Sequence, residues 1–142
     1  MLPMLPMLPL RTYIVEDSPV IRENLVATLE ELASLQVVGT AEDESTAVQW
    51  LTVPRQAVDL AIIDIFLKRG SGLGVLRHLT ALPRDAKLVV LSNYATPDMR
   101  KKCLELGADK VFDKSDEIDA LIQYCIRLAT GEPVAPHPAV LE

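Results

Sequence analysis

The segment Val58–Gly74, VDLAIIDIFLKRGSGLG, constrains the fold most, since its apolar run stops at an acid and gives way to a glycine-rich loop. A short apolar run that is rich in β-branched residues and bounded by turn residues predicts a strand buried on both faces, at the centre of a parallel sheet. Open α/β sheets bind ligands beyond the carboxyl ends of their strands, which is where Asp64 stands. Asp64 is therefore a candidate site residue; the alternative is that it only caps the following loop.

A strand pattern followed by a helix pattern occurs five times. The predicted strands cover residues 11–15, 36–41, 58–63, 87–91 and 109–112, and the predicted helices cover residues 18–32, 43–53, 73–82, 96–107 and 116–129. This alternation predicts an α/β fold, a doubly wound (βα)5 flavodoxin-like sandwich with a parallel five-stranded sheet. If the strand order is 2-1-3-4-5, a cleft opens between the first and third strands.

Helix ends and core faces can also be predicted. Ser18 before Pro19 is a helix start signal, and Ser115 is predicted to cap the last helix. The first helix has a stripe of apolar residues that is expected to face the core. This stripe consists of Ile21, Leu25, Leu29 and Leu32.

The 142 residues suffice for one domain, predicted at residues 11–130. Residues 1–10 contain the repeat MLPMLPMLP and are expected to form a disordered leader, and residues 131–142 a flexible proline-rich tail. The net charge of −6 disfavours direct nucleic-acid binding, and no apolar run is long enough to insert in a membrane. Two cysteines without CxxC spacing indicate reduced thiols and a cytoplasmic location.

Polar residues follow four of the five predicted strands. These residues are Glu16, Asp17, Asp64, Ser92 and Lys114. The carboxyl ends of parallel strands share one edge, so we expect the five side chains to surround one cleft. Neighbouring carboxylates repel each other unless a cation intervenes, and oxygen ligands without His or Cys favour Mg²⁺ over Zn²⁺.

Four segments then stand out together: VEDS, DIFLKRGSGLGVL, LSNYATP and VFDKS. In order and spacing they resemble the signature segments of the receiver domain of two-component response regulators, across residues 11–129. The resemblance implies a signalling module rather than an enzyme, and an output through contact with an unknown downstream protein.

The resemblance also assigns roles. Asp64 would accept a phosphoryl group from a phosphohistidine on a sensor histidine kinase or a histidine phosphotransfer protein. Glu16 and Asp17 would hold Mg²⁺ together with Asp64 and the backbone carbonyl of Phe66. Ser92 would be the switch hydroxyl and Lys114 the lysine that pairs with the phosphate. The output face would comprise the fourth helix, the fifth strand and the fifth helix.

The chain departs from the family pattern at several positions, and two of them lie close to Lys114. The family usually has a switch aromatic three residues before the lysine, where this chain has Val111, with Phe112 on the opposite face of the strand. Ser115 follows Lys114 where proline is usual. Neither change removes a group that phosphoryl transfer needs.

Three surface features give further hypotheses. Phe66 and Tyr94 each stand two residues beyond a site residue and would exclude water, which predicts slow loss of the phosphoryl group; the alternative is that both rings only pack on the surface. Val20, Ile21 and Asn24 are expected to form the docking patch for the phosphodonor. The basic run at residues 100–102 is predicted to be a solvated helix face, with homodimer or partner contact as the alternative.

Two other functions remain to be weighed. A Mg²⁺-dependent phosphohydrolase with an aspartyl nucleophile, similar to haloacid dehalogenases, would usually carry an acid two residues after Asp64, where this chain has Phe66. A flavodoxin-like cofactor binder would need a phosphate loop after the first strand, where Glu16 and Asp17 stand instead.

Overall fold

Strand β3 (Leu60–Ile63) lies at the centre of a parallel sheet, between β1 (Leu10–Val15) and β4 (Lys87–Ser92). The structure is a computed structural model that describes residues 9–53, 57–80 and 86–131. Every side chain of β3 is buried, because helices cover both faces of the sheet. The prediction of a buried central strand ending at Asp64 is therefore confirmed.

Two further strands, β2 (Leu35–Ala41) and β5 (Lys110–Asp113), complete the sheet of the described residues in the order β2-β1-β3-β4-β5. All pairings are parallel, as the crossover helices require. The helices are α1 (Pro19–Leu32), α2 (Glu44–Leu51), α3 (Gly72–Thr80), α4 (Pro97–Glu105) and α5 (Ile118–Thr130). The predicted α/β class and strand order are thus confirmed.

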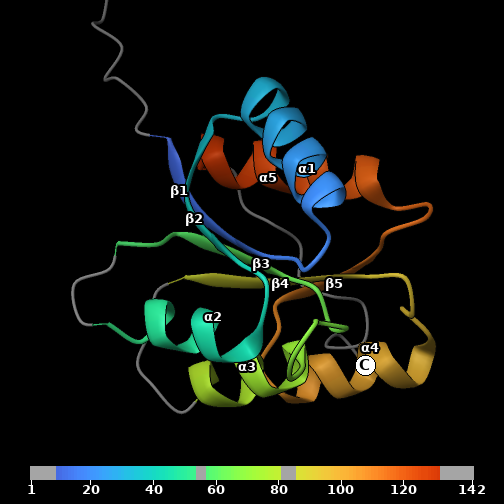
Figure 1. Ribbon diagram of the computed structural model, residues 1–142. Helices are drawn as coiled ribbons and strands as arrows, with labels where there is room; N and C mark the ends of the chain where they lie inside the picture. Colours follow the sequence, from blue (N-terminus) through green and yellow to red (C-terminus); the bar gives the residue numbers. More distant parts are fainter. Residues whose placement is uncertain (1–8, 54–56, 81–85, 132–142) are drawn as a thin grey trace, which may run out of the picture.

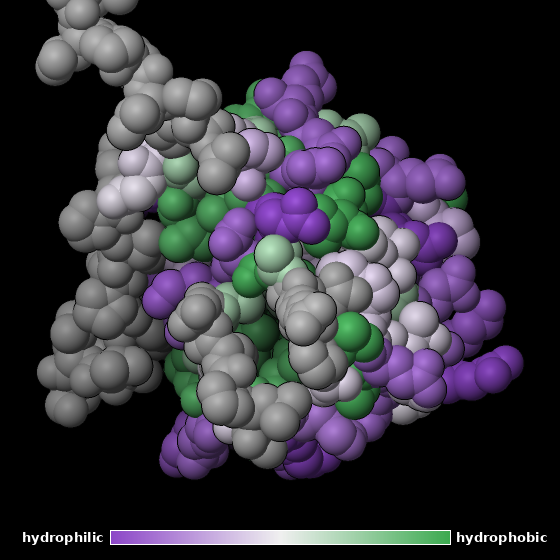
Figure 2. Space-filling view, turned by 90° about the vertical axis from the view of Figure 1, so that its left-hand side faces the viewer, coloured by the Kyte–Doolittle hydropathy of each residue, from purple (hydrophilic) through white to green (hydrophobic). Residues whose placement is uncertain are grey.

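The helices cover the sheet in two layers (Figure 1). Helices α1 and α5 lie on one face, and α2, α3 and α4 lie on the other. Alternate strand residues point to opposite faces, so Ile14 packs under α1 and α5 while Tyr13 and Val15 pack toward α2 and α3. The strands begin at the edge of the sheet that faces the viewer in Figure 2. Hydrophobic residues, in green, are visible among hydrophilic ones on this side. The carboxyl ends of the strands meet at the opposite edge.

Several local predictions need correction. Ser115 does not cap α5: its hydroxyl and backbone N–H both bond to Asp113 Oδ1, because a nearby carboxylate competes for it, and α5 begins later, at Ile118. Strand β1 begins at Leu10, within the predicted leader. Residues 1–8 of the predicted leader, the tail after residue 131 and the predicted end of α3 at Leu82 lie outside the described residues.

The predicted core stripe of α1 is also only partly correct. Leu25 and Leu29 are buried, but Leu32 is 53% exposed because α1 ends there and the next residue, Ala33, turns inward instead. Ile21 is exposed as well. No described helix is both long and apolar enough to cross a membrane.

The corrected stripe predicts unequal effects within one helix. Leu29 is fully buried, so Leu29→Ala should lower the free energy of unfolding by about 2–5 kcal/mol. Leu32→Ala removes the same atoms from an exposed site and should change it by less than ~0.5 kcal/mol. Urea unfolding followed by circular dichroism measures both; equal losses for the two variants would contradict this placement of α1.

Candidate functional site

Backbone pairing carries the sheet one residue beyond the strands and sets the candidate site residues side by side. The Asp64 N–H donates to Val15 O at 2.9 Å, and the Lys114 N–H donates to Ser92 O at 2.9 Å. Glu16 follows Val15 directly and is held by its own backbone bond to β2. Glu16, Asp64, Ser92 and Lys114 therefore stand in neighbouring rows at one edge of the sheet.

The ammonium group of Lys114 lies between two carboxylates. Its Nζ donates to Asp64 Oδ2 at 3.1 Å and forms an ion pair with Glu16 Oε1. The Lys114 side chain is 9% exposed, and both acids are buried. The other oxygen of Glu16, Oε2, accepts the Ser18 N–H at the start of α1. The contacts of Lys114 thus join the end of β5 to the ends of β1 and β3.

A third carboxylate, Asp17, adds negative charge to this buried group. One carboxylate oxygen from each of Glu16, Asp17 and Asp64 lies within 4.8 Å of the others. Burial raises the pKa of Asp64 above its usual value, although the charge and hydrogen bond of Lys114 act in the opposite direction. Burial also raises the pKa of Asp17, together with the hydrogen bond and charge of Glu16. The cluster therefore has more negative charge than one lysine can offset.

The charge balance and the donor atoms indicate which ion would fit. Burial alone would lower the pKa of Lys114, but its bonds to Glu16 and Asp64 outweigh burial and raise it, so Lys114 stays protonated. Three carboxylates and one ammonium leave an excess of two negative charges when all are ionised. The donors are oxygen atoms, which suit a hard divalent ion such as Mg²⁺. The residues present thus fit a bound Mg²⁺.

Ser92 and two aromatic rings border this cluster. Ser92 is fully buried, and its Oγ accepts the Tyr94 N–H at 3.0 Å. The rings of Phe66 and Tyr94 meet edge to face with their centroids 4.9 Å apart. Both rings are mostly exposed, so they pack against each other at the surface beside the site. Val111, by contrast, is buried in the core among residues of α3 and α4, on the face of β5 opposite Phe112.

The glycine-rich loop after β3 allows close approaches to Asp64 and Glu44. A Cβ at Gly72 would overlap the carbonyl oxygen of Asp64, and a Cβ at Gly74 would overlap the Glu44 carboxylate. Glu44 Oε1 accepts the Ser71 N–H at 2.9 Å, and Ser71 pairs with Phe66 across the loop. Glu44 therefore fixes the loop that follows Asp64. The sequence reasoning missed it, because an acid in the first turn of a helix is common.

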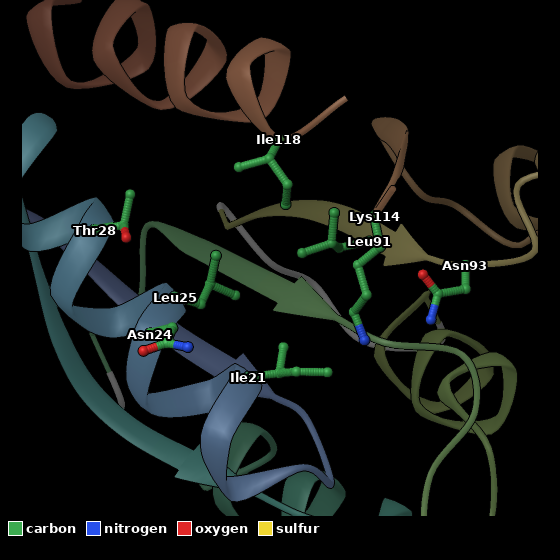
Figure 3. A pocket seen from close by; sticks show the side chains of 8 residues that line it. All are labelled: Ile21, Asn24, Leu25, Thr28, Leu91, Asn93, Lys114 and Ile118. Atoms are coloured by element: carbon green, nitrogen blue, oxygen red, sulfur yellow. The ribbon is translucent and has the colours of Figure 1, made fainter. Parts of the chain in front are cut away.

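A groove of about 370 Å³ lies beside the cluster on the α1 side (Figure 3). Its lining comes from α1, from the ends of β4 and β5, and from the start of α5. The lining residues are Ile21, Asn24, Leu25, Thr28, Leu91, Asn93, Lys114 and Ile118. Ile21 and Asn24 belong to the predicted docking patch, whose third member, Val20, is exposed next to them. The patch is thus continuous with a groove that reaches Lys114.

The predicted solvated basic run on α4 is wrong at its first residue. Lys101 and Lys102 are exposed as expected. Arg100 instead turns inward, where its guanidinium donates to backbone carbonyls and to the Glu117 carboxylate. The pattern RKK gives no sign of this difference, because the acceptors come from the loop before α4, from β5 and from the residue before α5.

Comparisons with known proteins agree with this geometry. Residues 12–125 match the family model described as the response regulator receiver domain. The protein-glutamate methylesterase/protein-glutamine glutaminase 5 of Anaeromyxobacter dehalogenans is 36% identical over 108 residues, which are 75% of this chain and 29% of that protein. This chain spans 29% to 61% of the length of four curated relatives that it matches.

Solved structures share the fold at lower identity. The CheX-CheY-BeF3-Mg²⁺ complex of Borrelia burgdorferi has a chain with a TM-score of 0.75 and 21% identity, covering 85% of this chain and 90% of that chain. A Burkholderia pseudomallei response regulator with a phosphorylated aspartic acid, calcium ion and citrate has a TM-score of 0.71 and 21% identity, covering 86% and 69%. Because the family model matches most of the chain and the fold agrees, the chain belongs to the response regulator receiver domain family of bacterial two-component systems.

Proposed function

We propose that Asp64 accepts a phosphoryl group from a phosphohistidine on a sensor histidine kinase or a histidine phosphotransfer protein. The observation that carries the proposal is the placement of Lys114 Nζ against both Glu16 and Asp64 at a buried sheet edge. A cation that lies beside an acid at this position can also pair with the negatively charged oxygens of a phosphoryl group that the acid has accepted. Membership of the receiver family supports the same reading.

Mg²⁺ would be held by Glu16, Asp17, Asp64 and the backbone carbonyl of Phe66. When bound, the ion would offset negative charge on the oxygens of the transferring group. The support in this chain is the three-carboxylate cluster, whose excess charge a divalent ion would balance.

The transfer itself needs few protein groups. An oxygen of Asp64 attacks phosphorus, the bond from phosphorus to the donor imidazole nitrogen breaks, and the leaving imidazole takes a proton from solvent. Lys114 moves its ammonium from Asp64 Oδ2 to an oxygen of the phosphoryl group. Ser92 gives up its bond to the Tyr94 N–H and turns its hydroxyl toward the same group. The loop that carries Ser92 moves with it. This movement shifts the equilibrium between the conformations of the face formed by α4, β5 and α5.

We place the phosphodonor against Val20, Ile21 and Asn24, because this exposed patch opens into the groove that ends at Lys114. The output would be contact with a downstream protein in the cytoplasm, with a homodimer as one form of such contact. Direct nucleic-acid binding is disfavoured by the net charge of −6. The receiver family mainly has signalling roles, and we favour signalling over phosphoester hydrolysis because Phe66 stands where the hydrolase would need its second acid.

Acetyl phosphate and Mg²⁺ should add one phosphoryl group to the protein, which intact-mass spectrometry detects. Asp64→Asn removes the nucleophilic carboxylate and nearly preserves its shape, so this variant should gain none. Excess EDTA should abolish the gain in the wild-type protein, because the acid cluster then lacks its cation. A gain that persists in Asp64→Asn would contradict the assignment, and turnover of many phosphoester molecules per protein would favour the hydrolase.

The aromatic pair predicts how long the phosphoryl group lasts. Replacing both Phe66 and Tyr94 by alanine opens a path for water, so loss of the phosphoryl group should accelerate by about tenfold, equivalent to ~1.4 kcal/mol of barrier. The backbone carbonyl of Phe66 is kept in this variant. Phos-tag gels after removal of acetyl phosphate give the rate, with Leu32→Ala as a control at an exposed apolar site. A wild-type half-life of only seconds would refute the shielding role.

A further inference from the structure

The side chain of Arg100 joins α4 to two loops of the candidate site. Its Nε donates to Ala95 O at 2.9 Å, its Nη1 donates to Val111 O at 3.0 Å, and its Nη2 donates to Glu117 Oε1. The side chain is 27% exposed, so these bonds are partly shielded from water. A planar guanidinium can serve such divergent acceptors at once, which an ammonium cannot do in the same geometry.

The three acceptors flank the residues that the proposed function uses. Ala95 lies three residues after Ser92, in the loop between β4 and α4. Val111 and Glu117 lie three residues before and three residues after Lys114. Glu117 Oε1 also accepts the Asp113 N–H at 2.8 Å. The Arg100 guanidinium therefore connects the Ser92 loop to the Lys114 loop on the side facing α4.

Val111 stands where the family usually has the switch aromatic, so its contact with Arg100 bears on how the switch is linked to α4. Its side chain is buried in the same core cluster as Cys103 and Ala108, and its backbone carbonyl is what Arg100 contacts. The hydrogen bond from Arg100 to the Val111 carbonyl ties this position of β5 to α4. The hydrogen bond from Arg100 also holds the pKa of Glu117 below its usual value, so the pair stays ionised near neutral pH.

We propose that Arg100 is a positioning residue that couples the Ser92 loop to β5 and α5, and that it holds the loop in the arrangement in which Ser92 bonds to Tyr94. This proposal rests on the proposed function, because it concerns the turn of Ser92 toward a phosphoryl group. That turn displaces the loop, and Ala95 O is fixed through Arg100 to Val111 and Glu117. The hydrogen bonds of Arg100 must therefore break or rearrange when Ser92 turns. Their loss costs free energy, so Arg100 opposes the turn of Ser92.

The simpler view is that Arg100 only anchors α4 to the rest of the fold. The two views predict opposite signs. An anchor that is removed leaves binding of a phosphoryl mimic unchanged or weaker, because the fold loosens. A restraint on the switch that is removed makes binding of the mimic tighter, because less free energy is needed to reach the bound conformation.

The test is an isothermal titration of the folded protein with beryllofluoride in the presence of Mg²⁺, in which calorimetry measures the Kd of the phosphoryl mimic. Arg100→Ala should lower the Kd by about fivefold or more, the usual lower range for coupling between sites. Arg100→Lys should resemble Arg100→Ala, because it keeps the charge but loses the planar fork. Lys101→Ala, which removes a neighbouring exposed charge from the same helix, should leave the Kd within twofold of wild type.

A double-mutant cycle with Glu117→Ala identifies the partner. If the two side chains act as one unit, the combined change in Kd should be much smaller than the product of the single changes. Glu117→Ala also keeps the test valid if Arg100→Ala fails to fold, since the other bonds of Arg100 remain. A Kd that is unchanged or higher in each folded variant would overturn the coupling role.

The result also separates this inference from the proposed function. If the wild-type protein binds beryllofluoride and gains a phosphoryl group while the Arg100 variants match it, the coupling role alone is refuted. If the wild-type protein neither binds beryllofluoride nor gains a phosphoryl group, the proposed function is refuted and the coupling role with it.

Discussion

The buried ammonium of Lys114 is the contact on which the arrangement of the site depends. It comes from the end of β5 and reaches Glu16 and Asp64, which follow β1 and β3. Removing one partner of a buried ion pair leaves an uncompensated charge and typically costs about 3–5 kcal/mol. The parallel sheet places these groups side by side. The repulsion between the carboxylates is offset only while a cation lies between them. One lysine leaves an excess of negative charge, which a divalent ion would balance and which would otherwise oppose the phosphoryl group that we propose for Asp64.

The loops that carry these charged groups and Ser92 are held in place by two residues outside the cluster, one on α2 and one on α4. Glu44, at the start of α2, fixes the loop after Asp64 through the Ser71 N–H, and glycines at positions 70, 72 and 74 make room for it and for the Asp64 carbonyl. Arg100, on α4, holds the loop after Ser92 and the residues around Lys114. The β3 loop is thus supported from α2 and the other two loops from α4. A change at the site can reach α4 through hydrogen bonds that the structure shows.

The sequence predicts the strands and the residues at their ends well, because each such residue follows a short apolar run whose β-branched residues and bounding turn residues favour a buried strand. This pattern predicts Asp64 and Lys114. The alternation of elements predicts a parallel sheet but not the order of its strands, and the observed order is the one expected for a flavodoxin-like sheet. Contacts that depend on how helices sit against loops were not predictable. Arg100 looks like its exposed neighbours in the sequence, and Leu32 continues an apolar spacing beyond the point where α1 ends. Ser115 has the residue type of a helix cap, but the nearby Asp113 carboxylate takes its hydrogen bonds.

A crystal structure of the protein with Mg²⁺ and beryllofluoride would show whether the strand ends form one site for a metal ion and a phosphoryl group on Asp64. We expect beryllium on an oxygen of Asp64, fluoride contacts from Lys114 and Ser92, and Mg²⁺ among Glu16, Asp17, Asp64 and the Phe66 carbonyl. An ion bound elsewhere, or a Ser92 hydroxyl still bonded to the Tyr94 N–H with beryllofluoride present, would contradict this expectation.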